Sequence, residues 1–233
     1  MKDLTKEIKT KKEDIVEKEY QKNVLWHVAK GGNLDMLIYL LNHGADVNAE
    51  DENGDKALTF AARAGHLDIV RYLIENQDTD INAVVDRCGG TALLNAAETN
   101  NFEIIRYLIK KGANVNFVDK QGWTSLMSVA CEGHLTIAKY LMDHGADVNA
   151  ENDYGRTALL NASQKGHFEV VRWLISHGSN INAIDNCGWT ALMYATKTGH
   201  FDMARYLVRH GAADEIKKEE TEMIEFLSKK IFG

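Results

Sequence analysis

Apolar residues recur along the chain with the period of an amphipathic helix, in pairs of short segments separated by glycine. The segment at residues 157–183 shows one such pair. Leu159 and Ala162 lie on one face of a first predicted helix, and Val170 and Leu174 lie on one face of a second. Two helices this short cannot bury their apolar faces alone. The pattern therefore predicts that successive helix pairs stack on one another.

Residues with special backbone or capping properties mark the ends of these helices. Thr157 can cap the first helix through its hydroxyl. Gly166 suits a left-handed end of that helix, and Gly178 suits the turn after the second helix. Asn100 stands where other copies have the glycine between the helices, and we expect it to adopt the left-handed conformation, which asparagine tolerates.

The same pair recurs in phase along most of the chain. The segments that begin at Gly122, Gly155 and Gly188 read GWTSLMSVACEGH, GRTALLNASQKGH and GWTALMYATKTGH, at a step of 33 residues. With three looser copies, the sequence predicts six repeats over residues 23–214. They start near residues 23, 56, 91, 124, 157 and 190.

This period, with its recurring Gly-His, Gly-Ala-Asp and Val-Asn elements, resembles the ankyrin repeat family, whose unit is about 33 residues with a T-P-L-H-x-A core. The proline of that core is absent in every copy, where the chain has Val24, Ala57, Ala92, Ser125, Ala158 and Ala191. Alanine also starts a helix well, so the fold should survive the change. The resemblance implies an all-α solenoid in which each repeat is a helix-turn-helix followed by a hairpin loop.

Both ends of the stack are expected to be capped. Residues 1–22 form a charged segment that predicts an amphipathic capping helix over the first repeat. Its apolar residues are Leu4, Ile8, Ile15 and Val16. Residues 215–233 predict a half-repeat that closes the other end, with polar residues outward as solenoid caps require. Its apolar residues are Met223, Phe226, Leu227 and Ile231.

One junction departs from the period. The step from the second repeat to the third is 35 residues, and the stretch at residues 77–88 lacks the usual loop glycine. Surface loops absorb insertions at small entropic cost, so we interpret the two extra residues as loop variation. A partner-specific bulge is the alternative.

Composition narrows the function classes. The 233 residues include 27 basic and 34 acidic side chains, for a net charge of -7, which argues against nucleic-acid binding. No apolar run is long enough to span a membrane, and the first residues are too charged for a secretory signal. Cys88, Cys131 and Cys187 show no CxxC pairing, so we expect reduced thiols in the cytoplasm.

Eight of the nine histidines repeat with the period. They are His66, His134, His167 and His200 after the inter-helix glycine, and His43, His144, His177 and His210 before the loop glycine. Equivalent positions in neighbouring repeats are about 8–10 Å apart, whereas zinc ligands lie about 2.0–2.1 Å from the metal. We therefore expect these side chains to bond loop backbone groups. No metal, no cofactor and no catalytic residue is predicted, and the chain is predicted not to be an enzyme.

The resemblance places partner recognition at the hairpin tips and on the concave face of the first helices. Trp123, Tyr154 and Trp189 fall on three successive tips. Residues at i, i+3 and i+4 of the first helices are expected to share the face opposite the core. The candidate protein-binding residues are Trp123, Tyr154, Arg156, Trp189, Tyr194, Lys165, Lys197, Glu132, Phe60 and Arg63. Tryptophan, tyrosine and arginine are enriched at interface hot spots.

The predicted function is non-catalytic protein–protein interaction, as an adaptor, scaffold or inhibitor. The partner would be a folded surface or a peptide segment, and the chain is expected to be a monomer. One alternative is a nucleotide or small-ligand sensor, in which Trp123 or Trp189 and Lys165 or Lys197 hold the ligand. A different setting is that of a bacterial effector delivered into a host cytosol.

Overall fold

The computed structural model describes residues 24–77, 79–84 and 89–212. The chain divides into two compact units, Met1–Lys120 (unit 1) and Gln121–Gly233 (unit 2), and each is described by itself. Both expected caps, residues 1–22 and 215–233, lie outside the described residues. The division into a cap, six repeats and a second cap therefore stays a prediction.

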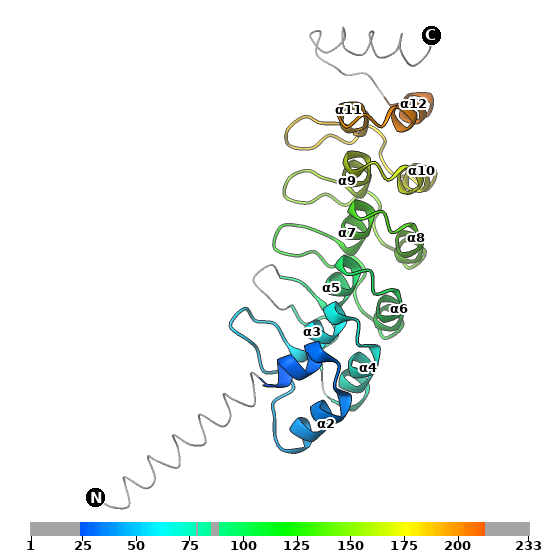
Figure 1. Cartoon of the computed structure of the whole chain (residues 1–233). Helices are drawn as coiled ribbons and strands as arrows, with labels where there is room; N and C mark the ends of the chain where they lie inside the picture. The colour runs from blue at the N-terminus through cyan, green and yellow to red at the C-terminus, as the bar shows by residue number, and fades with distance from the viewer. Residues whose placement is uncertain (1–23, 78, 85–88, 213–233) are drawn as a thin grey trace, which may run out of the picture. The chain divides into compact units, whose positions relative to one another are not determined.

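Unit 1 is a stack of helix pairs. Residues 24–31 are helical and lead into α2. The next helices are α2 (Leu34–Asn42), α3 (Ala57–Ala64), α4 (Leu67–Asn76), α5 (Ala92–Glu98) and α6 (Phe102–Lys110). Helix α3 packs on α5, and α4 packs on both α2 and α6, so the first and second helices of the pairs form separate layers (Figure 1).

Unit 2 repeats this arrangement. Its helices are α7 (Ser125–Cys131), α8 (Leu135–Asp143), α9 (Ala158–Lys165), α10 (Phe168–Ser176), α11 (Ala191–Lys197) and α12 (Phe201–Arg209). Helices α7, α9 and α11 pack in an inner row from which the hairpin loops project, and α8 and α10 pack in an outer row with α12 beside α11 (Figure 1). We call the first helix of each pair the inner helix and the second the outer helix.

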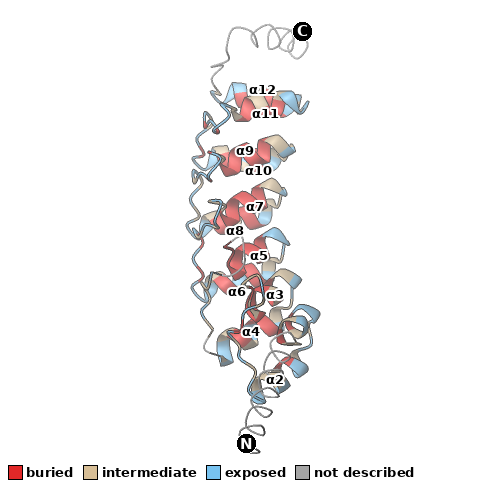
Figure 2. Cartoon of the chain, turned by 90° about the vertical axis from the view of Figure 1, so that its left-hand side faces the viewer, coloured by how far each residue is buried: buried red, intermediate tan, exposed pale blue. Residues whose placement is uncertain are grey.

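The predicted all-α class is confirmed. Within residues 24–77, 79–84 and 89–212 no strand is found, although isolated bridge residues occur, such as the antiparallel bridge between Ile184 and Thr190. The core lies between the two layers of each unit and between successive inner helices, and Figure 2 shows buried residues along the helices of the stack. In unit 2 it includes Leu141, Leu160 and Leu174.

The predicted helix ends are confirmed. The Thr157 hydroxyl accepts the backbone N–H of Leu160 at 3.3 Å, and the Thr190 hydroxyl does the same for Met193 at 3.2 Å. Gly166 and Gly178 have φ of 82° and 91°, in the left-handed region. Asn100 has φ of 60° and is the one non-glycine residue with positive φ in the described part of the chain.

Six of the eight periodic histidines bond backbone carbonyls, and these carbonyls belong to helix residues rather than to the loops that the sequence predicted. His167 Nε2 lies 2.9 Å from the carbonyl oxygen of Cys131, which ends the inner helix of the preceding repeat. His66 makes the same bond to Lys30 at 2.9 Å. At the outer-helix ends, His Nδ1 bonds the carbonyl of the aromatic residue four positions earlier. These pairs are Tyr39–His43, Tyr140–His144, Trp173–His177 and Tyr206–His210.

Candidate protein-binding site

Each hairpin loop of unit 2 is fixed by one polar side chain at its base. The Asp185 carboxylate oxygen Oδ1 accepts the backbone N–H groups of Cys187 and Trp189, both at 2.9 Å. Asn152 Oδ1 makes the same two bonds in the preceding hairpin, to Tyr154 and Arg156, both at 3.0 Å. The loop backbone is therefore held in a tight turn by its own side chain.

Main-chain bonds also join neighbouring hairpins. The Asn186 N–H donates to the Tyr154 carbonyl at 3.0 Å, and the Asp153 N–H donates to the Gln121 carbonyl at 3.0 Å. The backbone of residues 153–154 is thus bonded to the hairpins on both sides. Side chains on this hairpin project from a fixed frame.

Arg156 connects its own hairpin to the next repeat. Its Nη2 donates to the Tyr194 hydroxyl at 2.5 Å, and its Nη1 donates to Gln164 Oε1 at 2.7 Å. The Tyr194 hydroxyl donates in turn to Asp185 Oδ2 at 2.5 Å. Arg156 Nε lies 3.8 Å from the same carboxylate oxygen. The Asp185 side chain is 3% exposed, so these partners compensate a carboxylate removed from water.

The environment of Tyr194 keeps its hydroxyl protonated. Burial, followed by its hydrogen bond to the Asp185 carboxylate, raises the pKa of Tyr194 from 10.0 to about 12. The nearby Arg156 guanidinium opposes this shift. At neutral pH the tyrosine therefore acts as a fixed donor to Asp185 and acceptor from Arg156.

The structure brings Trp189 and Lys197 together. Lys197 Nζ lies 4.2 Å from the centroid of the Trp189 ring, which is a cation–π contact. The Trp189 and Tyr194 ring centroids are 5.2 Å apart. The alternative of a nucleotide sensor needs the indole face for stacking on a base, and here the ammonium group of Lys197 already covers one face.

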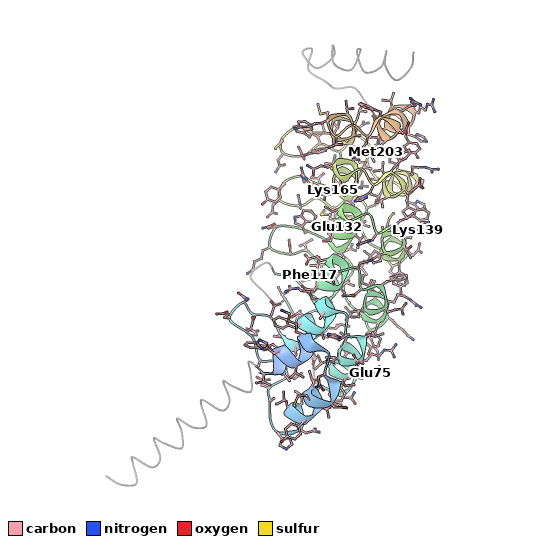
Figure 3. The ribbon with its side chains drawn as sticks, in the orientation of Figure 1. Glu75, Phe117, Glu132, Lys139, Lys165 and Met203 are labelled. Atoms are coloured by element: carbon pink, nitrogen blue, oxygen red, sulfur yellow. The ribbon has the colours of Figure 1, made fainter. Side chains whose placement is uncertain are left out.

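The other candidate residues of unit 2 differ in exposure. Tyr154 is 54% exposed at its hairpin tip. Glu132, Lys165 and Lys197 are exposed at the ends of the inner helices, with Glu132 and Lys165 labelled in Figure 3. Trp123 and Trp189 are half-buried, so neither indole ring is displayed as openly as the Tyr154 ring.

We predicted that three positions of each inner helix share an open face. This prediction is wrong for one of the three positions. The fourth residue after the N-cap is buried in four repeats, as Asn95, Ser128, Asn161 and Tyr194. Tyr194, a candidate contact residue, is only 7% exposed. Asn95 and Ser128 turn back to the carbonyl of their own N-cap residue, and Tyr194 is covered by its own hairpin through Asp185 and Trp189. Tyr194 supports the site from within, and the surface is formed by its neighbours.

Phe60 and Arg63 belong to unit 1 and form a separate group. Phe60 is half-buried. Arg63 Nε donates to Asn95 Oδ1 at 2.7 Å, and Arg63 Nη1 lies 3.8 Å from Asp55 Oδ2. The Asp55 carboxylate also accepts the Thr59 hydroxyl at 3.2 Å.

One contact that sequence reasoning missed has a simple signal. The residue just before the N-cap of an inner helix contacts the residue eight positions later, and we call these two residues the hairpin–helix pair. The pair is Asp55 with Arg63, Arg156 with Gln164, and Trp189 with Lys197. In these three pairs the two side chains are chemically complementary, so comparing the two positions in these repeats could have found the contact.

A second missed feature lies on the outer helices. Lys139 Nζ lies 4.5 Å from the centroid of the Trp173 ring in the next repeat, and Arg71 lies 5.4 Å from that of Tyr107. Each contact joins one repeat to the next in the same unit. These aromatic residues therefore belong to the framework of the stack.

Comparison with known proteins agrees with this architecture. A family model for ankyrin repeats matches three times, over residues 1–85, 77–152 and 148–220. The chain belongs to the ankyrin repeat family. Ankyrin repeats generally mediate protein–protein interaction, and the fold is typically non-catalytic.

Individual relatives match over short segments. Human Ankyrin repeat domain-containing protein 29 is 46% identical over 61 residues, which cover 26% of this chain and 20% of that protein. Notch-regulated ankyrin repeat-containing protein of Xenopus tropicalis is 46% identical over 43 residues, covering 18% and 38%. L-asparaginase of Dirofilaria immitis is 41% identical over 51 residues, covering 22% and 9%. The chain spans well under half the length of each relative, so their names transfer no activity to it.

Two further observations bear on chemistry and location. Among the residues described, no three His, Cys, Asp or Glu side chains gather in a group that could hold a metal ion. In the same part of the chain, no helix combines the length and the apolar character needed to cross a membrane.

Proposed function

We propose that this chain binds another protein through a surface of unit 2, which we call the tip surface. It consists of Tyr154, Arg156, Lys165, Trp189 and Lys197. The observation that carries the proposal is Tyr154, a large aromatic side chain that is 54% exposed on a hairpin bonded to its neighbours on both sides. A rigid aromatic anchor loses little conformational entropy on binding, which favours affinity.

The chemistry around Tyr154 suits a partner that brings both apolar and acidic groups. A guanidinium has five N–H donors. Arg156 directs Nη1 to Gln164 and Asn161, one N–H of Nη2 to Tyr194 and Nε toward Asp185, which leaves the second N–H of Nη2 for a partner. Its side chain is 24% exposed, so a partner carboxylate can reach it. Lys165 is exposed on the neighbouring inner helix α9. Arginine and tyrosine are the residue types that dominate interface energetics.

Binding of this kind needs no reaction at the surface. The chain would act as an adaptor, scaffold or inhibitor by presenting a pre-formed surface that blocks one partner or brings two together. Cys131 and Cys187 are free thiols. Free thiols suit a reducing compartment, which supports the cytoplasm as the place of action.

The test compares two tyrosines of equal exposure. Tyr154→Ala should abolish capture of a partner from cell lysate, whereas Tyr39→Ala, on the outer helix α2 and 56% exposed, should leave capture unchanged. The captured protein is then purified and titrated against both variants. We expect Tyr154→Ala to weaken binding by about thirtyfold, equivalent to about 2 kcal/mol for a hot spot. Equal affinities, with circular dichroism showing intact folding, would refute the tip surface.

A further inference from the structure

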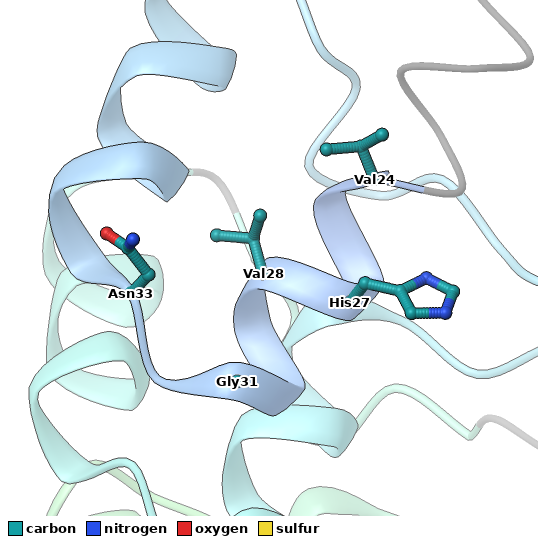
Figure 4. Close-up of a pocket in the computed structure, with 5 residues that line it drawn as sticks. All are labelled: Val24, His27, Val28, Gly31 and Asn33. Carbon is teal, nitrogen blue, oxygen red and sulfur yellow. The ribbon is translucent and has the colours of Figure 1, made fainter.

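An apolar hollow lies at the start of the described chain in unit 1. It has a volume of about 460 Å³ and is lined by Val24, His27, Val28, Gly31 and Asn33 (Figure 4). Val24 and Val28 lie one turn apart on the helix formed by residues 24–31. The hollow therefore has an apolar floor on the side of the helix that precedes the stack.

Equivalent positions elsewhere show that this side of an inner helix is normally covered. Helices α5, α9 and α11 each follow another inner helix in their own unit. At the positions of Val24 and Val28 these helices have alanine, and every one is at most 2% exposed. The residues are Ala92, Ala96, Ala158, Ala162, Ala191 and Ala195. Val24 and Val28 are only half-buried, although valine has more apolar surface to bury than alanine.

The side chains at these two positions are larger in the first repeat than in α5, α9 and α11. Valine at the second position is compatible with full burial, since Val129 of α7 is 0% exposed. The half-burial of Val24 and Val28 therefore leaves apolar surface that a capping segment can cover.

We propose that residues 1–22 of this same chain dock on the hollow. They precede Val24 directly and, if helical, would be about 33 Å long, enough to cross the end of a repeat. Ile8 and Ile15 are seven residues apart, at the spacing of one helix face, and the remaining residues are mostly charged. The ankyrin family model also begins its match at residue 1 and continues to residue 85, so the segment aligns as part of the stack. This inference is independent of the tip surface.

The test places a photo-activated cross-linker at the floor of the hollow. In the full-length chain, p-benzoylphenylalanine replaces Val28, and the dilute purified protein is irradiated and digested for mass spectrometry. We expect cross-links from position 28 to peptides within residues 1–22 of the same molecule. The same probe at Lys165, which is exposed on α9, should give none.

A pair of matched variants shows whether the apolar face makes the contact. Ile15→Gln with Val16→Gln should reduce the intramolecular cross-link by about tenfold, because the apolar area that drives docking is lost. Lys12→Gln with Glu13→Gln keeps the net charge and the apolar face, and should reduce it little. Hydrogen exchange at Leu25 and Ala29 should become faster only in the first variant.

Three results would overturn the proposal. The first is cross-linking between two copies of the chain without an intramolecular product, which would make the hollow a dimer contact. The second is the absence of any intramolecular cross-link from position 28 to residues 1–22. The third is an intramolecular product that Ile15→Gln with Val16→Gln leaves unchanged.

Discussion

Arg63 in unit 1 and Arg156 in unit 2 each contact the other member of their own hairpin–helix pair and one residue of the next repeat. The two arginines occupy opposite positions within the pair. Arg63 is the second member of its pair and faces Asp55, whereas Arg156 is the first member and faces Gln164. Each arginine then reaches the fourth residue after the next N-cap. That residue is Asn95 in unit 1 and Tyr194 in unit 2.

The two networks differ in how far they are removed from water. The Arg63 and Asp55 side chains are 41% and 7% exposed, against 24% and 3% for Arg156 and Asp185. The arginine–carboxylate distance is 3.8 Å in both. Asp185 also holds its own hairpin and accepts the Tyr194 hydroxyl. The comparison shows that the repeat determines which residue an arginine contacts. The side chains around that contact determine how much stability the hairpin loses without it.

The largest predicted effect is the removal of Asp185. Asp185→Ala leaves two backbone N–H groups, the Tyr194 hydroxyl and the Arg156 guanidinium without their acceptor. We expect a loss of about 4 kcal/mol in the free energy of unfolding, as for a broken buried ion pair. Asp55→Ala should cost about 2 kcal/mol, because its network is smaller and more exposed. Urea unfolding of both variants measures the difference.

A milder substitution separates the two roles of Asp185. Asp185→Asn keeps Oδ1 as an acceptor for the hairpin backbone, as Asn152 does in the preceding hairpin. It removes the charge opposite Arg156 and replaces Oδ2, which accepts the Tyr194 hydroxyl, by an N–H donor. Its loss should therefore fall between those of Asp55→Ala and Asp185→Ala. Equal losses for Asp55→Ala and Asp185→Ala would contradict the ranking of the two networks.

The next largest predicted effect is the stability lost when a glycine at the end of an inner helix is replaced by alanine. A Cβ atom at Gly166 in unit 2 would overlap the imidazole ring of His200, whereas one at Gly65 in unit 1 would meet the Asn101 amide oxygen at 2.9 Å. Both glycines have positive φ, at 82° and 87°. We expect Gly166→Ala to cost about 3 kcal/mol, from the left-handed strain plus the overlap. Gly65→Ala should cost about 2 kcal/mol, because the asparagine side chain can turn aside.

Gly178→Ala supplies the control for this pair. Gly178 has φ of 91°, but no atom lies within 4 Å of a Cβ built there. Its substitution therefore measures the strain alone, at about 1–2 kcal/mol. If thermal unfolding shows that Gly166→Ala and Gly178→Ala lose the same stability, the His200 contact makes no contribution.

The third predicted effect is a pH dependence of stability. We expect it for Tyr194, which can ionise, and not for Asn95 at the equivalent position of unit 1, which does not titrate. The folded-state pKa of Tyr194 is about 12, above its ordinary value of 10.0. Its bonds therefore stabilise the fold fully below pH 10.0, and this contribution disappears as the pH rises from 10.0 through about 12. The stability difference between the wild type and Tyr194→Phe should shrink over that interval.

This difference is measured by urea unfolding at several pH values, and the subtraction removes effects of lysines and other tyrosines that both proteins share. Asn95→Ala, compared with the wild type in the same way, should give a difference that changes little with pH. A constant difference for Tyr194→Phe up to pH 12 would show that the hydroxyl makes no pH-dependent contribution.

The sequence predicted the local features of the fold well. Thr157, Gly166 and Asn100 behave as expected because capping and left-handed turns depend on a few adjacent residues. The backbone contacts of the periodic histidines were predicted in kind, because a repeating position meets an equivalent backbone group in each repeat, but the carbonyls lie on helices and not on loops. These features need no knowledge of how one repeat lies on the next.

The candidate site was harder to predict because it is built between repeats. The burial of Tyr194 depends on Asp185 in its own hairpin and on Arg156 from the repeat before. Counting positions on one helix could not show that a loop covers the fourth residue. The complementary residues of the hairpin–helix pair were a usable signal, but only once one contact was known.

The smallest predicted effect tests whether the hairpin–helix pair stabilises the stack without any arginine. In the last described hairpin the pair is Trp189 with Lys197, joined by a cation–π contact at 4.2 Å. Lys197→Ala should cost about 0.5–1 kcal/mol, the range of exposed cation–π contacts, whereas Lys165→Ala should cost less than about 0.5 kcal/mol.

A double-mutant cycle of Lys197→Ala with Trp189→Ala isolates the contact, since it cancels what each side chain contributes alone. A coupling energy near zero would restrict the role of the pair to the charged and hydrogen-bonded versions at Asp55 and Arg156. A measurable coupling would mean that the pair stabilises this hairpin through a cation–π contact, as the pairs at Asp55 and Arg156 do through charged and hydrogen-bonded contacts.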